Sequence, residues 1–230
     1  MSTIAENINF IKNRIETVSN GRKITLLAVT KTFSADCAKQ AIDTGISDIA
    51  ESKIQEAIPK FEVLSNSLNG INKHFIGHLQ SNKAKKAVLN FDLIQSLDSI
   101  DLAKDINRHA KDINKVQKCL IELKVSTEET KYGASKEKVN EIYDYCVANC
   151  PNVLICGIMT IAPYFDDKEL VRPYFKLAYN VFENIKEIKN DGNFNILSMG
   201  MSDDFEIAIQ EGSNMVRVGT AIFGERNYDK

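Results

Sequence analysis

The run Ile24-Thr25-Leu26-Leu27-Ala28-Val29-Thr30 is mostly apolar and lacks helical spacing. Such a run indicates a short strand that is buried on both faces, as in a parallel sheet. Before it, alternating steps of four and three residues separate Ile4, Ile8, Ile11, Ile15 and Val18, which predicts an amphipathic helix ending near Gly21. After it, Ser34 is the expected N-cap of a second helix.

The same alternation of apolar runs and helical patterns continues along the chain. Further strands are predicted near residues 47–50, 73–77, 92–97, 117–125, 153–161, 195–200 and 215–223, and helices near 53–65, 82–89, 99–111, 135–149, 169–189 and 203–211. With the run at 24–30, eight strands are predicted, which suits a (β/α)8 barrel. We therefore predict the α/β class, as a single (β/α)8 TIM-type barrel domain over residues 1–230 with an additional N-terminal helix. Strand counting leaves an open doubly wound sheet as the alternative.

The composition excludes several classes of protein. Of 230 residues, 43% are hydrophobic and 26% charged, which excludes a disordered or low-complexity chain. The 29 basic and 31 acidic side chains give a net charge of -2, so general binding to nucleic acid or to anionic membranes is not expected. The five cysteines are odd in number and follow no framework spacing, which indicates reduced thiols. With neither a signal-peptide pattern nor a membrane-spanning run, we expect a cytoplasmic protein, and the small charge favours a monomer.

Lys31 stands at the carboxyl end of the first predicted strand, where barrels carry their functional groups. Burial depresses the pKa of a lysine, and the free amine that results can attack an aldehyde. The alternative is a lysine whose stem simply extends out of the barrel mouth. Lys31 alone does not separate the two.

Polar residues also collect at the ends of the seventh and eighth predicted strands. Ser202 follows Gly200 and is either the N-cap of the next helix or part of a phosphate seat at its start. Arg217 lies between valines in an apolar strand, so it needs an acceptor, either a structural carboxylate or a ligand. Gly219 allows close backbone approach and Thr220 adds a hydroxyl. Because barrels commonly bind phosphate after strands 7 and 8, these residues predict a phosphate pocket.

Five ordered blocks of sequence resemble the pyridoxal phosphate homeostasis proteins, relatives of the N-terminal barrel of alanine racemase. The blocks are residues 27–32 (LAVTKT), 74–83 (HFIGHLQSNK), 157–161 (GIMTI), 198–204 (SMGMSDD) and 215–224 (MVRVGTAIFG). The resemblance implies a barrel that carries pyridoxal 5'-phosphate (PLP) as an internal aldimine on Lys31. It also implies phosphate contacts at Ser202, Gly219 and Thr220, an arginine facing the pyridine nitrogen at Arg217, and Met201 near the cofactor. It assigns no catalytic residue.

The chain departs from the family pattern at one place beside the cofactor. The family usually has Phe-Gly-Glu-Asn after its second strand, whereas this chain has Ile49-Ala50-Glu51-Ser52, so a contact to the ring is in doubt. Lys131 matches a family lysine near the mouth whose role is not fixed. Cys146 and Cys150 lie on the apolar face of a predicted helix and are expected in the core. The three histidines are too dispersed for a zinc signature, so no metal is expected.

The resemblance favours a PLP carrier in intracellular PLP homeostasis, without a dedicated substrate reaction and with apo PLP-enzymes as recipients. A nitrogen that faces Arg217 stays unprotonated, which weakens the ring as an electron sink. The alternative is a small PLP-dependent amino-acid racemase, which would need a second acid or base from a further domain. Only Glu225 to Lys230 follow the last block, so no such domain is expected. A barrel that binds a sugar phosphate is a third hypothesis, and it predicts no covalent adduct.

Overall fold

Eight parallel strands close into a barrel in the computed structural model, which describes residues 2–126 and 132–225. The strands are β1 (Thr25–Val29), β2 (Asp48–Glu51), β3 (Asn72–Phe75), β4 (Leu93–Leu97), β5 (Gln117–Glu122), β6 (Val153–Met159), β7 (Ile196–Ser198) and β8 (Met215–Val218). Each strand pairs with the next in the chain, and β8 pairs with β1 to complete the ring. The predicted TIM-type barrel is therefore confirmed, and the open doubly wound sheet is wrong.

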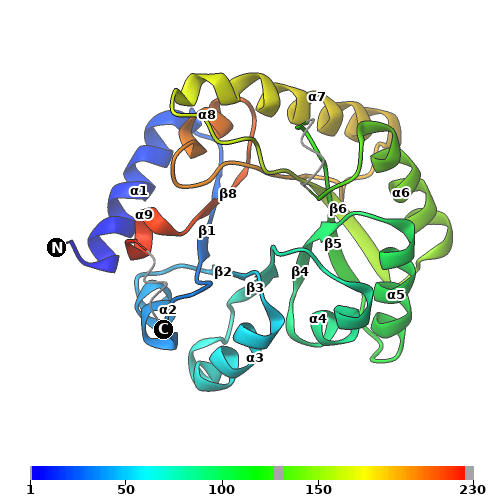
Figure 1. Ribbon diagram of the computed structural model, residues 1–230, viewed down its shortest axis with the longest axis horizontal. Coiled ribbons are helices and arrows are strands. Elements are labelled where there is room, and N and C mark those ends of the chain that lie inside the picture. The colour runs from blue at the N-terminus through cyan, green and yellow to red at the C-terminus, as the bar shows by residue number, and fades with distance from the viewer. Residues whose placement is uncertain (1, 127–131, 226–230) are drawn as a thin grey trace.

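Helices surround the strands as an outer ring (Figure 1). They are α1 (Ile4–Ser19), α2 (Ala35–Asp43), α3 (Ile54–Val63), α4 (Ala84–Asn90), α5 (Ile100–Lys111), α6 (Lys136–Asn149), α7 (Arg172–Lys189), α8 (Phe205–Gln210) and α9 (Thr220–Phe223). The first is the predicted N-terminal helix, and Thr3 and Glu6 form a capping box that starts it. It packs against α8 and α9, so the two ends of the described chain lie side by side.

The strands alternate between two apolar layers. Leu27, Val29 and Met215 point into the barrel, whereas Ala28, Val216 and Val218 point outward against the helices. Arg217 shares the inward face with Met215, as the period of two predicts. Cys146 and Cys150 are buried in the outer layer, which confirms their predicted place in the core.

The eighth strand is shorter than predicted. It ends at Val218, and residues 220–223, predicted as strand, form the single turn α9. Gly219 breaks the strand with φ of -119° and ψ of -77°, and its carbonyl accepts the N–H groups of Ile222 and Phe223. The backbone around Thr220 therefore turns toward α1, against which α9 packs, instead of continuing along the sheet.

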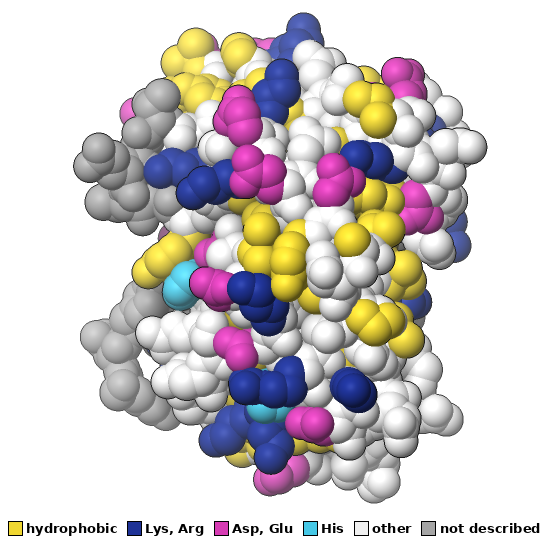
Figure 2. Space-filling view, turned by 90° about the vertical axis from the view of Figure 1, so that its right-hand side faces the viewer, with side chains coloured by type: hydrophobic (Ala, Val, Ile, Leu, Met, Phe, Trp, Pro, Cys, Tyr) yellow, Lys and Arg dark blue, Asp and Glu magenta, His cyan; other side chains and the backbone are white. Residues whose placement is uncertain are grey.

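The surface over α5 and α6 carries charges of both signs. Figure 2 shows Lys and Arg side chains interspersed with Asp and Glu on this face, with apolar side chains between them. Within residues 2–126 and 132–225, no helix has the length and apolar character needed to cross a membrane.

Candidate functional site

Lys31 lies at the carboxyl end of β1, next to the end of β8. The register pairs Ala28 with Val218, so Lys31 and Gly219 follow neighbouring strand ends. Lys31 is half-buried, and it has the same parity as the inward-facing Leu27 and Val29. A Cβ added to Gly219 would lie 3.4 Å from Cβ of Val29. The fold thus brings two distant parts of the sequence together at the barrel mouth.

A buried charged network lies behind the backbone that carries Lys31. Nζ of Lys60, on α3, donates to Oε1 of Glu51 at 2.5 Å, to the carbonyl of Thr30 at 2.7 Å and to Oε1 of Glu56 at 3.2 Å. The Thr30 hydroxyl donates to the same Glu51 oxygen at 2.7 Å. The Lys60 side chain is 6% exposed and that of Glu51 is fully buried. We call Thr30 to Thr32 together with Glu51, Glu56 and Lys60 the Lys31 flank.

The network also holds a strained residue. Thr32 has φ of 69°, a left-handed conformation that a β-branched residue rarely adopts. Its N–H donates to the Glu56 carboxylate, which holds the backbone in this conformation. Lys31 is therefore fixed on both sides, through the carbonyl of Thr30 and the N–H of Thr32.

The electrostatics of this network are finely balanced. Burial raises the pKa of Glu51, although Lys60 and Thr30 act to lower it. The second Glu51 oxygen, Oε2, is buried without a hydrogen-bond partner. Lys60 therefore stabilises the carboxylates of both Glu51 and Glu56. The Glu51 side chain contacts α3, on the outer side of the sheet. The neighbouring Ser52 is half-buried directly after β2.

On the neighbouring strand β8, Arg217 is 3% exposed, and its guanidinium is bonded only to neutral groups among the described residues. Its Nη1 donates to the Ser198 hydroxyl at 2.9 Å and its Nη2 to the carbonyl of Thr160 at 2.8 Å. Burial lowers the pKa of Arg217 to about 10, although Asp204 and Glu122 act to raise it. Within residues 2–126 and 132–225, the acceptors of the Arg217 guanidinium are thus a hydroxyl and a carbonyl, and the structural carboxylate considered above is not among them.

Ser202 links the loop after β7 to the start of α9. Its hydroxyl accepts the backbone N–H groups of Gly219 and Ala221, each at 3.3 Å. Its alternative prediction as a helix N-cap is wrong, because α8 begins at Phe205 with Asp204 as the N-cap residue. We call Ser198, Ser202, Arg217 and Gly219 the Arg217 flank.

The remaining predicted residues lie around this flank. Met201 is 39% exposed and borders a small cavity with Asp204. The Asp204 carboxylate accepts the Met201 N–H at 2.6 Å, so it faces its own loop. Thr220 is exposed at the first position of α9. Lys131 lies outside the described residues.

The rim at β5 carries titratable groups that sequence reasoning missed. Glu122 is 7% exposed and lines a cavity of about 180 Å³ with Tyr132. Burial and nearby Asp98 raise its pKa to about 7, although Arg217 acts to lower it. The His78 ring stacks on Tyr132 with centroids 3.8 Å apart. The only signal in the sequence was an acidic residue late in a buried strand.

The barrel mouth therefore combines an amine with groups that can hold an anion. Lys31 supplies the amine, Arg217 a buried cation, and Ser202 a hydroxyl with two backbone N–H groups close by. The N–H bonds to Ser202, at 3.3 Å, are longer than the usual 2.9–3.0 Å, so a charged acceptor can compete for them. This arrangement can take a carbonyl compound that carries an anionic group.

The chain is similar to proteins with PLP in their names. The family model "Alanine racemase, N-terminal domain" matches residues 1–227. A pyridoxal phosphate homeostasis protein of Aquifex aeolicus is 40% identical over 88% of this chain and 87% of that protein. One of Pasteurella multocida is 35% identical over 99% of this chain and all of that protein.

Solved structures agree with these sequence matches. PipY of Synechococcus elongatus, solved with PLP bound, has a TM-score of 0.87 at 30% identity, covering 96% of this chain and all of that one. An alanine racemase of Clostridium difficile has a TM-score of 0.72 at 18% identity, and this chain covers 57% of it. The racemase likeness concerns the fold alone. By its family model and by relatives that match along its length, this chain belongs to the pyridoxal phosphate homeostasis protein family, whose barrel is that of the alanine racemase N-terminal domain.

Proposed function

We propose that this chain binds PLP, holds it as a Schiff base on Lys31, and acts in intracellular PLP homeostasis without a dedicated substrate reaction. The observation that carries the proposal is the half-buried residue Lys31 at a barrel mouth that also holds Arg217 and Ser202. The relatives named as PLP homeostasis proteins and the PLP-bound PipY support the cofactor. We treat residues 1–230 as one PLP-binding barrel domain.

The residues present fit this group. PLP supplies an aldehyde that condenses with an amine, and it also carries a phosphate and a basic ring nitrogen. The Gly219 backbone leaves room, because an added Cβ would meet no protein atom closer than 3.4 Å. Glycine at this position is therefore explained by an approaching ligand better than by the protein's own packing.

Each residue has a distinct task in this proposal. Lys31 presents its amine from a backbone that the charged network fixes. Ser202, Gly219 and Thr220 donate to the phosphate, and Met201 packs near the ring. Arg217 retains its proton at neutral pH, so it donates to the ring nitrogen and keeps that nitrogen unprotonated.

An unprotonated ring nitrogen favours a carrier over an enzyme. The electron sink on which transamination and decarboxylation depend is weakened. Racemisation is the activity that such an arginine still allows, so a small amino-acid racemase is the second candidate. The relatives' names favour the homeostasis role. We further propose a cytoplasmic monomer that delivers PLP to apo-enzymes and binds neither nucleic acid nor membrane.

Borohydride reduction followed by peptide mass mapping tests the covalent link. We expect a pyridoxyl group on the Lys31 peptide of wild type and none in Lys31→Ala. An adduct on another lysine alone would contradict the proposal. Enzyme-like turnover of free amino acids, lost in Lys31→Ala, would favour the racemase.

A further inference from the structure

A chain of hydrogen-bonded side chains runs through the barrel interior to Arg217. Nη1 of Arg217 donates to the Ser198 hydroxyl at 2.9 Å, and that hydroxyl donates to Oε1 of Gln95 at 2.7 Å. Nε2 of Gln95 lies 2.9 Å from Nδ1 of His74, whose Nε2 lies 3.0 Å from Oδ1 of Asp48. The chain crosses β8, β7, β4, β3 and β2.

The hydrogen bonds in this chain run in a fixed direction. The amide of Gln95 accepts from Ser198, so its nitrogen donates to Nδ1 of His74 and to Sδ of Met215, at 3.3 Å. Because Nδ1 of His74 accepts, its Nε2 carries the proton and donates to Asp48. Each side chain therefore sets the orientation of the next.

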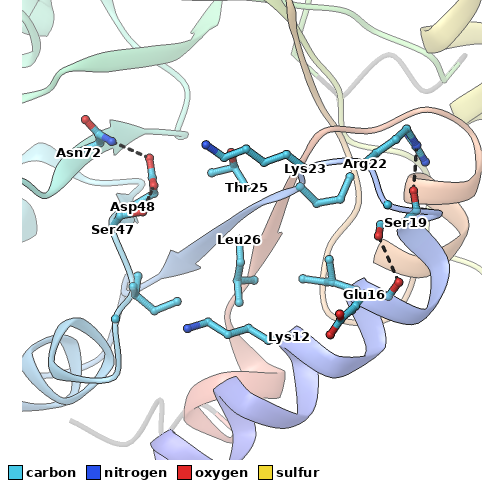
Figure 3. Close-up of a pocket in the computed structure, with 15 residues that line it drawn as sticks. Lys12, Glu16, Ser19, Arg22, Lys23, Thr25, Leu26, Ser47, Asp48 and Asn72 are labelled. Atoms are coloured by element: carbon cyan, nitrogen blue, oxygen red, sulfur yellow. Dashed lines mark hydrogen bonds between the residues drawn. The ribbon is translucent and has the colours of Figure 1, made fainter.

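The far end of the chain is firmly anchored. Asp48 also accepts from Asn72 at 3.0 Å and from the Ser47 hydroxyl at 2.5 Å. Burial acts to raise the pKa of Asp48, but the hydrogen bonds from His74, Ser47 and Asn72 outweigh it and lower the pKa. Figure 3 shows Asp48, Ser47 and Asn72 together at the amino end of the barrel, where they line an open cleft. The volume of this cleft is about 740 Å³. The Asp48 carboxylate therefore fixes the direction of the hydrogen bonds that begin at His74.

The interior of such a barrel is normally filled by branched apolar side chains. Here Gln95 and Ser198 are fully buried, and His74 and Arg217 are each 3% exposed. Buried polar groups are tolerated only when they are satisfied, and an incomplete network is worse than an apolar core. Ser198 is the only side chain among the described residues that accepts a hydrogen bond from Arg217, so the hydrogen-bonded network fixes the guanidinium.

We propose that Gln95 and His74 are positioning residues that act through Ser198 to orient the Arg217 guanidinium toward the ring nitrogen of PLP. This rests on the proposed function. In the structure, His74 and Gln95 connect to Arg217 through the Ser198 hydroxyl, so the two act on the cofactor through these hydrogen bonds.

The test compares Gln95→Leu with Gln117→Leu. Gln117 is also a fully buried strand glutamine, but its amide donates to the carbonyls of Asp92 and Lys118, outside the chain. We expect Gln95→Leu to weaken PLP binding about tenfold, since the Ser198 hydroxyl loses its acceptor and no longer holds the Arg217 guanidinium in one orientation, and to shift the absorption spectrum of the bound cofactor. Gln117→Leu should lower the melting temperature and leave the spectrum unchanged. Equal spectra and equal dissociation constants for the two variants would overturn the inference.

A second variant and a readout without cofactor keep the test decisive. Ser198→Ala removes only the hydroxyl and should reproduce the spectral shift even where Gln95→Leu does not fold. In cofactor-free wild type, nitrogen NMR should find His74 protonated at Nε2 and the Arg217 guanidinium in one orientation, which Ser198→Ala releases. Failure of wild type to retain PLP would refute the proposed function. Retention with an unaltered Arg217 in Ser198→Ala would refute this inference alone.

Discussion

On the Lys31 flank, a buried lysine and two carboxylates fix the backbone, whereas on the Arg217 flank neutral hydroxyls and carbonyls hold a buried cation. Lys60 bonds to Glu51 and Glu56, and Arg217 to Ser198 and the carbonyl of Thr160. The charged flank can hold a strained backbone, because ionic hydrogen bonds are about twice as strong as neutral ones. Within residues 2–126 and 132–225 no carboxylate is hydrogen-bonded to Arg217, so its charge is available to a ligand. In the proposed function, the first flank fixes the backbone of Lys31 and the second leaves Arg217 available to PLP.

Lys60→Met gives the largest expected effect and tests the charged flank. It leaves the carboxylates of Glu51 and Glu56 without their cation, and breaking a buried ion pair in this way costs about 3–5 kcal/mol. Thr32 should then relax, so formation of the Lys31 adduct should also slow. Urea unfolding and the rate of PLP uptake measure the two effects.

Lys39→Met is the matched control. Lys39 pairs with Asp43 at 2.7 Å, also at a spacing of four, but both side chains are at least half exposed. Exposed pairs of this kind contribute roughly 0.2–1 kcal/mol. Similar losses in the two variants would show that burial does not distinguish the Lys31 flank.

Glu122→Gln tests whether the buried cation of the Arg217 flank depends on the Glu122 carboxylate. Burial raises the folded-state pKa of Glu122 from 4.5 to about 7, so the folded protein binds this proton more tightly than the unfolded chain does. The stability that the proton contributes is present at low pH and is lost as the pH rises from about 4.5 to about 7. Above that range the variant should be more stable than wild type, by at most about 3 kcal/mol.

The measurement is the free energy of unfolding of both proteins on either side of that pH range. The stability difference between variant and wild type should shrink toward the acid side. A variant that is less stable than wild type at high pH would show that the Glu122 carboxylate stabilises the Arg217 cation electrostatically. Arg217 would then be supported by a charged group as well as by neutral ones.

The two flanks also differ in how far the sequence predicts them. The eight strands could be predicted because their apolar runs are buried on both faces, and Lys31 and Arg217 could be found because each is a charge at the end of, or inside, such a run. Lys60 could not, since Glu56 and Lys60 look like an ordinary surface pair at a spacing of four. The available signal was its place between Ala57 and Phe61 on the buried face of α3.

Ser202 shows where a local sequence pattern predicts the wrong contact. A serine before a helix has the pattern of an N-cap, and nothing local indicates that its hydroxyl turns to the start of α9 instead. That contact joins two loops that only barrel closure brings together. Local rules describe residues within a turn of each other, so such a contact stays beyond them.

Ser202→Ala should have a smaller effect than Lys60→Met and Glu122→Gln. It leaves the N–H groups of Gly219 and Ala221 without the hydroxyl acceptor, and loss of such bonds costs about 1 kcal/mol. PLP retention should fall by more than this stability loss suggests, because the hydroxyl is also a proposed phosphate donor. Equilibrium dialysis of the loaded protein checks retention, and unchanged retention would remove Ser202 from the phosphate pocket.

Gly219→Ala has the smallest expected effect on stability and gives the sharpest test of the Arg217 flank. The residue has φ of -119°, which alanine adopts freely, and the new Cβ would meet Val29 at ordinary contact distance. The melting temperature should therefore stay near that of wild type while PLP affinity falls, because the methyl group fills space that the ligand needs. In contrast, Gly200→Ala should destabilise the protein itself, since φ is +95° and the new Cβ would lie 2.5 Å from Cβ of Ala208. If Gly219→Ala bound PLP as tightly as wild type, the cofactor would not approach this backbone. The glycine at position 219 of the Arg217 flank would then need another explanation.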